Sequence, residues 1–92
     1  MAILTDLQRQ EFTASYPDWE LDGETIRRSY RFRDFSQAMG FVTRVALAAE
    51  RADHHPDIDI RWNTVTLALS THSEGGLTRR DVDLASLIDT LV

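Results

Sequence analysis

Hydrophobic and polar residues follow two different periods along the chain, and the alternation of these periods predicts seven elements. Helical spacing occurs near the N-terminus, over residues 34–52 and over the last fifteen residues. Between these segments, apolar and polar residues alternate one by one, which is typical of half-buried strands. The predicted order is helix, two strands, helix, two strands, helix.

Three capping patterns mark the starts of the predicted helices, at residues 5–8, 34–37 and 78–81. The first helix should end near Tyr16, because Pro17 cannot continue it. The second helix should run to about Ala52, and its apolar stripe over residues 35–49 is wide enough to cover a sheet and to meet a partner helix in an oligomer.

The predicted strands are residues 19–21, 25–32, 57–62 and 64–72. In the third strand we expect Ile58, Ile60 and Trp62 to face the core. Short connections imply antiparallel pairing. The fold class is therefore α+β, as a single domain over residues 1–92 with a four-stranded antiparallel sheet and helices packed on one face (α-β-β-α-β-β-α). The longer strands, 25–32 and 64–72, are expected to expose an edge that pairs with another subunit.

The amino-acid composition limits the functions and reaction types that the protein can have. The 92 residues include 42% hydrophobic and 27% charged residues, a globular balance, and no apolar run is long enough to span a membrane. The N-terminal residues lack the pattern of a signal peptide, so we expect a cytoplasmic protein. A net charge of −5 argues against direct nucleic-acid binding. The absence of cysteine and lysine excludes thiol, zinc-thiolate and Schiff-base chemistry.

All three histidines lie between positions 54 and 72, and with two acidic residues they form the candidate site: Glu50, His54, His55, His72 and Asp81. Each lies at the end of a predicted element, where sites are usually built. Imidazoles titrate near neutral pH, and a carboxylate neighbour selects their tautomer. The set suits concerted proton delivery and removal, as in an elimination, a hydration or an isomerisation.

Structural interpretations of the same residues stay open. His54-His55-Pro56 also fits a solvated helix terminus, and Asp81 fits the third residue of a capping box opened by Thr78. A metal site is disfavoured, because His54 and His55 are adjacent and lack the i, i+4 spacing of helical metal ligands.

The run Glu50-Arg51-Ala52-Asp53-His54-His55-Pro56, followed by Trp62, His72 and Asp81, resembles the signature of the pterin-4a-carbinolamine dehydratases. The resemblance extends from about Trp19 to the C-terminus. It implies dehydration of 4a-hydroxytetrahydropterin to the quinonoid dihydropterin, which recycles tetrahydropterin for aromatic amino-acid hydroxylases. It also implies a homodimer or homotetramer, and neither a metal nor an organic cofactor.

The resemblance further implies roles for individual residues. His54, His55 and His72 match the active-site histidines, with His55 and His72 expected nearest the reacting groups. Glu50 and Asp81 match the acids that orient the imidazoles. The residues matching the pterin-binding segments are Asp53, His54, His55, Pro56, Ser70, Thr71, His72 and Ser73.

Two other functions remain as alternatives. Proteins of this fold also act as a dimerisation cofactor of a transcription factor or as an assembly factor, and both roles need the apolar helix stripe and pairable strands. A metal-dependent hydrolase on the same histidines is the third hypothesis.

Overall fold

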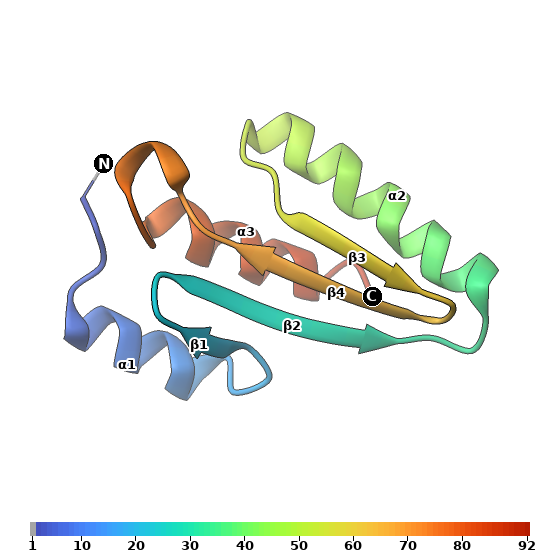
Figure 1. Cartoon of the computed structure of the whole chain (residues 1–92), viewed down its shortest axis with the longest axis horizontal. Coiled ribbons are helices and arrows are strands. Elements are labelled where there is room, and N and C mark those ends of the chain that lie inside the picture. The colour runs from blue at the N-terminus through green and yellow to red at the C-terminus, as the bar shows by residue number, and fades with distance from the viewer. Residues whose placement is uncertain (1) are drawn as a thin grey trace.

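The structure is a computed structural model that describes residues 2–92. It contains three helices, α1 (Asp6–Ser15), α2 (Phe35–Ala52) and α3 (Arg79–Asp89), and a short 3₁₀ turn, η1 (His72–Glu74). The strands are β1 (Glu20–Asp22), β2 (Thr25–Arg31), β3 (Asp57–Arg61) and β4 (Thr64–Leu69). All neighbouring strands pair antiparallel in the order β1-β2-β4-β3 (Figure 1), which confirms the predicted α+β class and element order.

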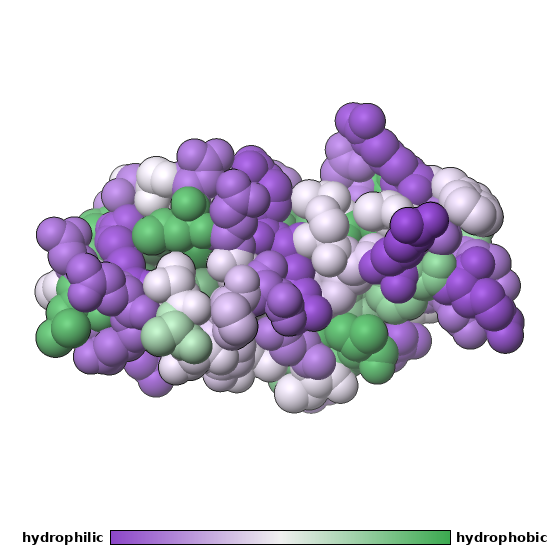
Figure 2. All heavy atoms as spheres, turned by 90° about the horizontal axis from the view of Figure 1, so that it is seen from below, coloured by the Kyte–Doolittle hydropathy of each residue, from purple (hydrophilic) through white to green (hydrophobic). Residues whose placement is uncertain are grey.

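The two faces of the sheet differ in character. On one face Ile26 pairs with Leu69 and Tyr30 with Val65, and these side chains are buried in a core completed by helix residues that include Phe41. The opposite face carries polar side chains such as the hydrogen-bonded pair Ser29 and Thr66. Figure 2, viewed from the side of α1 and β2, shows mostly hydrophilic residues with separate apolar patches.

The prediction that the two long strands expose an edge is wrong. Both β2 and β4 are central, and the edges are β1 and β3. The reason is that α2 crosses the sheet and delivers β3 to its far side, so the hairpin partner β4 returns to pair with β2 (Figure 1).

The expectation that Ile58, Ile60 and Trp62 face the core is confirmed for the two isoleucines and wrong for Trp62. Ile58 and Ile60 pair with Leu67 and Val65 and so lie on the core face, but at the open edge they remain 38% and 37% exposed. Trp62 follows the strand in a left-handed turn conformation (φ 51°) and is 65% exposed. An edge strand has a neighbouring strand on one side only, which leaves these side chains partly uncovered.

One polar residue interrupts the apolar face of β2. The guanidinium of Arg28 lies 4.5 Å from the ring centre of Tyr30 and 3.0 Å from Oδ1 of Asp89 on α3. The hydroxyl of Tyr30 donates to the same oxygen at 2.6 Å. Burial and this hydrogen bond raise the pKa of Tyr30. Arg28 therefore ties the sheet to α3.

No helix within residues 2–92 combines the length and the apolar character needed to cross a bilayer.

Candidate active site

The end of α2 directs the adjacent histidines away from the helix. Asp53 adopts the left-handed conformation (φ 50°, ψ 43°). Its N–H donates to the carbonyl of Glu50 at 3.2 Å, and the N–H of His54 donates to the carbonyl of Ala49 at 3.1 Å. This is the Schellman pattern of helix termination, in which glycine is the usual residue. An aspartate is tolerated here because Asp and Asn visit the left-handed region more readily than other side chains do.

His54 is buried and bound to a buried carboxylate. Its Nε2 donates to Oδ1 of Asp81 at 2.5 Å, and the two residues are 8% and 0% exposed. The other oxygen, Oδ2, accepts the hydroxyl of Thr71 at 2.8 Å and the backbone N–H of Thr78 at 2.9 Å. The predicted capping box of α3 is confirmed, and its acid also fixes the ring of His54.

His55 forms the exposed counterpart of this pair. Its Nε2 donates to Oε1 of Glu50 at 2.5 Å, and both side chains are largely open to solvent. Glu50 lies on the last turn of α2, so the turn formed by Asp53 folds His55 back beside it. Each of the two adjacent histidines therefore has its own carboxylate.

His72 does not end a strand as predicted. β4 ends at Leu69, and His72 begins η1. The N–H of Thr71 donates to the carbonyl of Gly76 at 3.1 Å, and the N–H of Gly76 donates to the carbonyl of Thr71 at 3.3 Å. This reciprocal pair closes a short loop from which the exposed His72 projects.

The three histidines meet at one open groove of about 290 Å³, which is lined by Asp53, His54, His55, Ser70, Thr71, His72, Ser73 and Arg80. Seven of the eight residues predicted to hold the ligand are among them, and Pro56 is not. Glu50 and Asp81 do not line the groove, but they bind His55 and His54, respectively. The fold thus brings the end of α2 against the loop that follows β4.

Comparison with known proteins identifies the family. The family model described as pterin 4 alpha carbinolamine dehydratase matches residues 2–91. This chain belongs to the pterin-4-alpha-carbinolamine dehydratase family.

Several relatives of this family match over nearly their whole length. Proteins from Mycobacteroides abscessus and Nocardia farcinica, both named "Putative pterin-4-alpha-carbinolamine dehydratase", are 51% and 55% identical, over 100% and 97% of this chain and 98% and 94% of their own. A crystal structure from Brucella melitensis, described as a transcriptional coactivator/pterin dehydratase, superposes with a TM-score of 0.92 at 39% identity, over 98% of each chain.

A more distant structure shares the fold alone. It is described as a pterin dehydratase-like protein that acts as a RuBisCO assembly factor in the alpha-carboxysome. It matches with a TM-score of 0.67 at 19% identity, over 79% of this chain and 84% of its own.

Two residues at or near the histidine groove were not predicted. Arg80 lines the groove beside His54. The nearby carboxylate of Asp83 pairs with Arg79 instead, so within residues 2–92 the Arg80 guanidinium has no ion-pair partner. Thr78 is buried, and its hydroxyl lies 2.8 Å from that of Thr71. The capping pattern had marked Thr78 only as the start of a helix, and no spacing rule marked Arg80.

The ionisable side chains at the groove include imidazoles that are bound to carboxylates. Across the described residues, no three metal-ligating side chains converge on one point. An imidazole that donates Nε2–H to a carboxylate carries its free lone pair on Nδ1 when neutral. The arrangement is therefore suited to proton transfer by histidines of fixed tautomer.

Proposed function

We propose that this chain dehydrates 4a-hydroxytetrahydropterin to the quinonoid dihydropterin by histidine general acid–base catalysis. The observation that carries the proposal is the meeting of His54, His55 and His72 at one groove, two of them bound to carboxylates at 2.5 Å. The reaction would return oxidised pterin towards the tetrahydropterin that aromatic amino-acid hydroxylases use. It requires no metal or organic cofactor.

The reaction needs two proton transfers. One imidazolium gives a proton to the 4a-hydroxyl, which leaves as water when the C4a–O bond breaks. The N5 lone pair forms the C4a=N5 double bond, and a neutral imidazole takes the N5 proton. His55 and His72 are assigned these transfers, because both are exposed at the groove.

The remaining site residues are assigned to orienting the imidazoles or to binding the pterin. His54 is almost fully buried and bound to Asp81, so we assign it to orientation of the site and proton exchange with His55. Glu50 holds the ring of His55. Asp53, Ser70, Thr71 and Ser73 line the groove and offer polar atoms to the pterin edge. Pro56 follows His55 outside the groove, so its part would be to fix the backbone there.

Arg80 adds a donor for an acceptor atom of the substrate. The pterin 4-oxo group is one bond from the reacting carbon C4a, so it lies close to any pair of histidines that act at C4a and N5. A guanidinium without a carboxylate partner suits a carbonyl oxygen. We therefore assign Arg80 to the 4-oxo group.

The decisive experiment follows the turnover of enzymatically generated 4a-hydroxytetrahydropterin by absorbance, with wild type beside His55→Ala. Dehydration faster than the spontaneous reaction, and a loss of about 10²-fold in the variant, are expected. A folded wild-type protein that leaves the spontaneous rate unchanged would refute the enzyme assignment.

The alternative is a non-enzymatic role as a dimerisation cofactor or assembly factor. Exposed apolar residues on α2, on β3 and directly after β3 favour an association surface: Leu47, Ile58, Ile60 and Trp62. We propose that a second copy of this chain covers it, in a homodimer or homotetramer, because the open edge of β3 carries unpaired backbone groups. A stoichiometric foreign partner without pterin turnover would support the alternative instead.

A further inference from the structure

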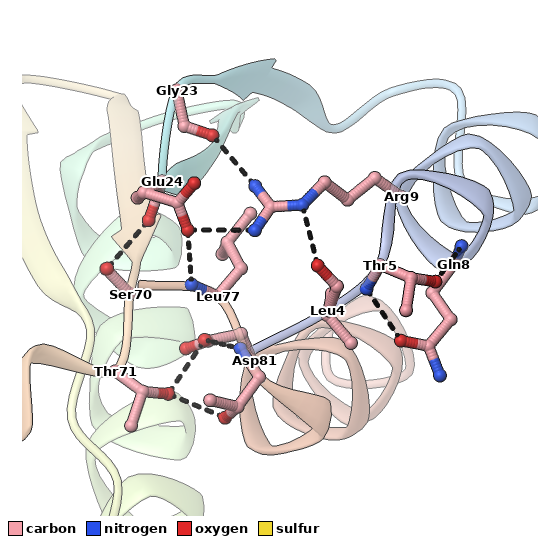
Figure 3. A network of polar contacts seen from close by, with 11 residues as sticks. Leu4, Thr5, Gln8, Arg9, Gly23, Glu24, Ser70, Thr71, Leu77 and Asp81 are labelled. Atoms are coloured by element: carbon pink, nitrogen blue, oxygen red, sulfur yellow. Dashed lines mark hydrogen bonds and ion pairs between the residues drawn. The ribbon is translucent and has the colours of Figure 1, made fainter. Parts of the chain in front are cut away.

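A cluster of polar contacts joins α1 to the loop that carries His72, outside the histidine groove (Figure 3). Arg9 on α1 donates from Nη2 to Oε1 of Glu24 at 2.9 Å and from Nη1 to the carbonyl of Gly23 at 3.2 Å. Its Nε donates to the carbonyl of Leu4 at 3.1 Å. Oε1 of Glu24 also accepts the backbone N–H of Leu77 at 3.1 Å. One carboxylate oxygen thus joins a guanidinium to the loop backbone.

Glu24 holds the loop at both of its ends. The backbone carbonyl of Glu24 accepts the hydroxyl of Ser70 at 2.7 Å, just before the loop, while its side chain binds Leu77 just after it. Between them, Gly76 packs directly against the carboxylate, since a Cβ built there would lie 2.0 Å from Oε1. Any larger residue at position 76 would displace the Glu24 side chain.

The clamped segment, residues 70–78, supplies three parts of the candidate site. Thr71 and Thr78 both donate to Oδ2 of Asp81, the carboxylate that binds His54. His72 projects from the middle of the same segment. A shift of this segment would therefore move His72 and loosen the acceptor of His54 together.

We infer that Glu24, held by Arg9, is a positioning residue for His72 and for the network around Asp81. The ion pair joins a largely buried Arg9 side chain, 12% exposed, to a Glu24 side chain that is 50% exposed. Because Glu24 contacts segment 70–78 directly, the role of the pair would be local order of that segment. The Arg9 guanidinium and the Leu77 N–H also lower the pKa of Glu24, which keeps the carboxylate charged at neutral pH. The catalytic part of this inference rests on the proposed dehydration.

The test compares Glu24→Ala with Glu24→Gln, which keeps an oxygen able to accept the Leu77 N–H. Asp22→Ala is the matched control, because it removes an exposed ion pair with Arg27 on the same hairpin without touching the segment. Amide hydrogen exchange by NMR is read at Thr71, Gly76 and Leu77, and kcat and KM are measured for the dehydration. Arg9→Met serves as the second variant should Glu24→Ala fold poorly.

In Glu24→Ala we expect the three amides to exchange roughly 10-fold faster and kcat to fall by about 10-fold, as local opening misplaces His72. Glu24→Gln should keep most of the amide protection and most of the wild-type kcat, and Asp22→Ala should match wild type in both. Unchanged exchange in Glu24→Ala, or faster exchange with unchanged kcat, would overturn the inference. A wild-type protein without dehydratase activity would refute the proposed function alone, and the exchange data would still decide whether Glu24 holds the segment.

Discussion

Nε2 of His54 lies 2.5 Å from Oδ1 of Asp81, although 27 residues separate them in the sequence. The pair connects the end of α2 to the first turn of α3, and both partners are buried. The same carboxylate caps α3 through the backbone N–H of Thr78. Asp81 therefore combines the structural role of a capping acid with the orientation of a site histidine.

Asp81→Asn should destabilise the fold despite its similar shape. If the amide oxygen accepts His54, the amide NH₂ must face the donating N–H of Thr78, so one buried donor loses its acceptor. The expected cost is about 1–3 kcal/mol in the free energy of unfolding, measured by urea denaturation. Asp83→Asn, two residues along α3 and exposed, is the control and should change stability by less than about 0.5 kcal/mol. Equal stabilities of the two variants would contradict the role of the network.

The three histidines should differ in what their removal costs. His54→Ala leaves the Asp81 carboxylate buried without its partner, and we expect a loss of about 3 kcal/mol of stability as well as of activity. His55→Ala and His72→Ala remove exposed rings, so we expect thermal stability to stay near that of wild type while kcat falls by about 10²-fold. Thermal unfolding and dehydration rates, measured for each variant, distinguish the loss of stability from the loss of activity. A destabilised His55→Ala with a normal kcat would reverse the assignment.

The sequence predicted the elements because their signals are local. The capping patterns at Thr5 and Thr78 and the proline after α1 depend on neighbours within a few residues, and the structure confirms them. Strand order depends on where α2 delivers β3, which no local pattern encodes, so the edges and the exposure of Trp62 were predicted wrongly.

In the site, too, the residues with a local sequence signal were predicted and those that depend on the folded chain were not. The groove gathers residues that the family signature had named, whereas Arg80 and the contacts of Glu24 depend on segments that meet only after folding. Arg9 lies in the N-terminal stretch where the resemblance is weakest, and no local pattern there connects it with His72.

Arg80→Gln should raise KM and leave kcat almost unchanged. The proposed contact to the 4-oxo group would be made in both the bound substrate and the transition state, and such uniform binding affects KM alone. An increase of about 10-fold is expected for the loss of one charged hydrogen bond. Arg79→Gln is the control, since that side chain pairs with Asp83 on the helix surface. A fall in kcat without a change in KM would assign Arg80 to the chemical step instead.

Asp34 should make the stability depend on pH in the acid range. Its carboxylate accepts the N–H of Gln37 at 2.9 Å at the start of α2, and this bond, with Arg33, lowers the pKa of Asp34 from 3.8. The charged form therefore stabilises the fold fully above the unfolded pKa, and this contribution is lost as pH falls through the lower folded value. Asp34→Asn keeps a capping oxygen without the charge. Urea denaturation should show a gap between wild type and Asp34→Asn that narrows below about pH 4, and a constant gap would contradict the shift.

The open edge of β3 leads to the last prediction. Ile58 and Ile60 lie on the core face of an edge strand and remain more than one third exposed, and Trp62 extends the apolar surface beyond the strand. A lysine is a common means by which proteins prevent edge-to-edge pairing, because its charge resists burial between strands. Ile60→Lys should therefore shift the protein towards monomer in sedimentation velocity experiments. Gln10→Lys adds the same charge on exposed α1 and should sediment like wild type. A wild-type protein that sediments as a monomer at every concentration would refute self-association at this edge.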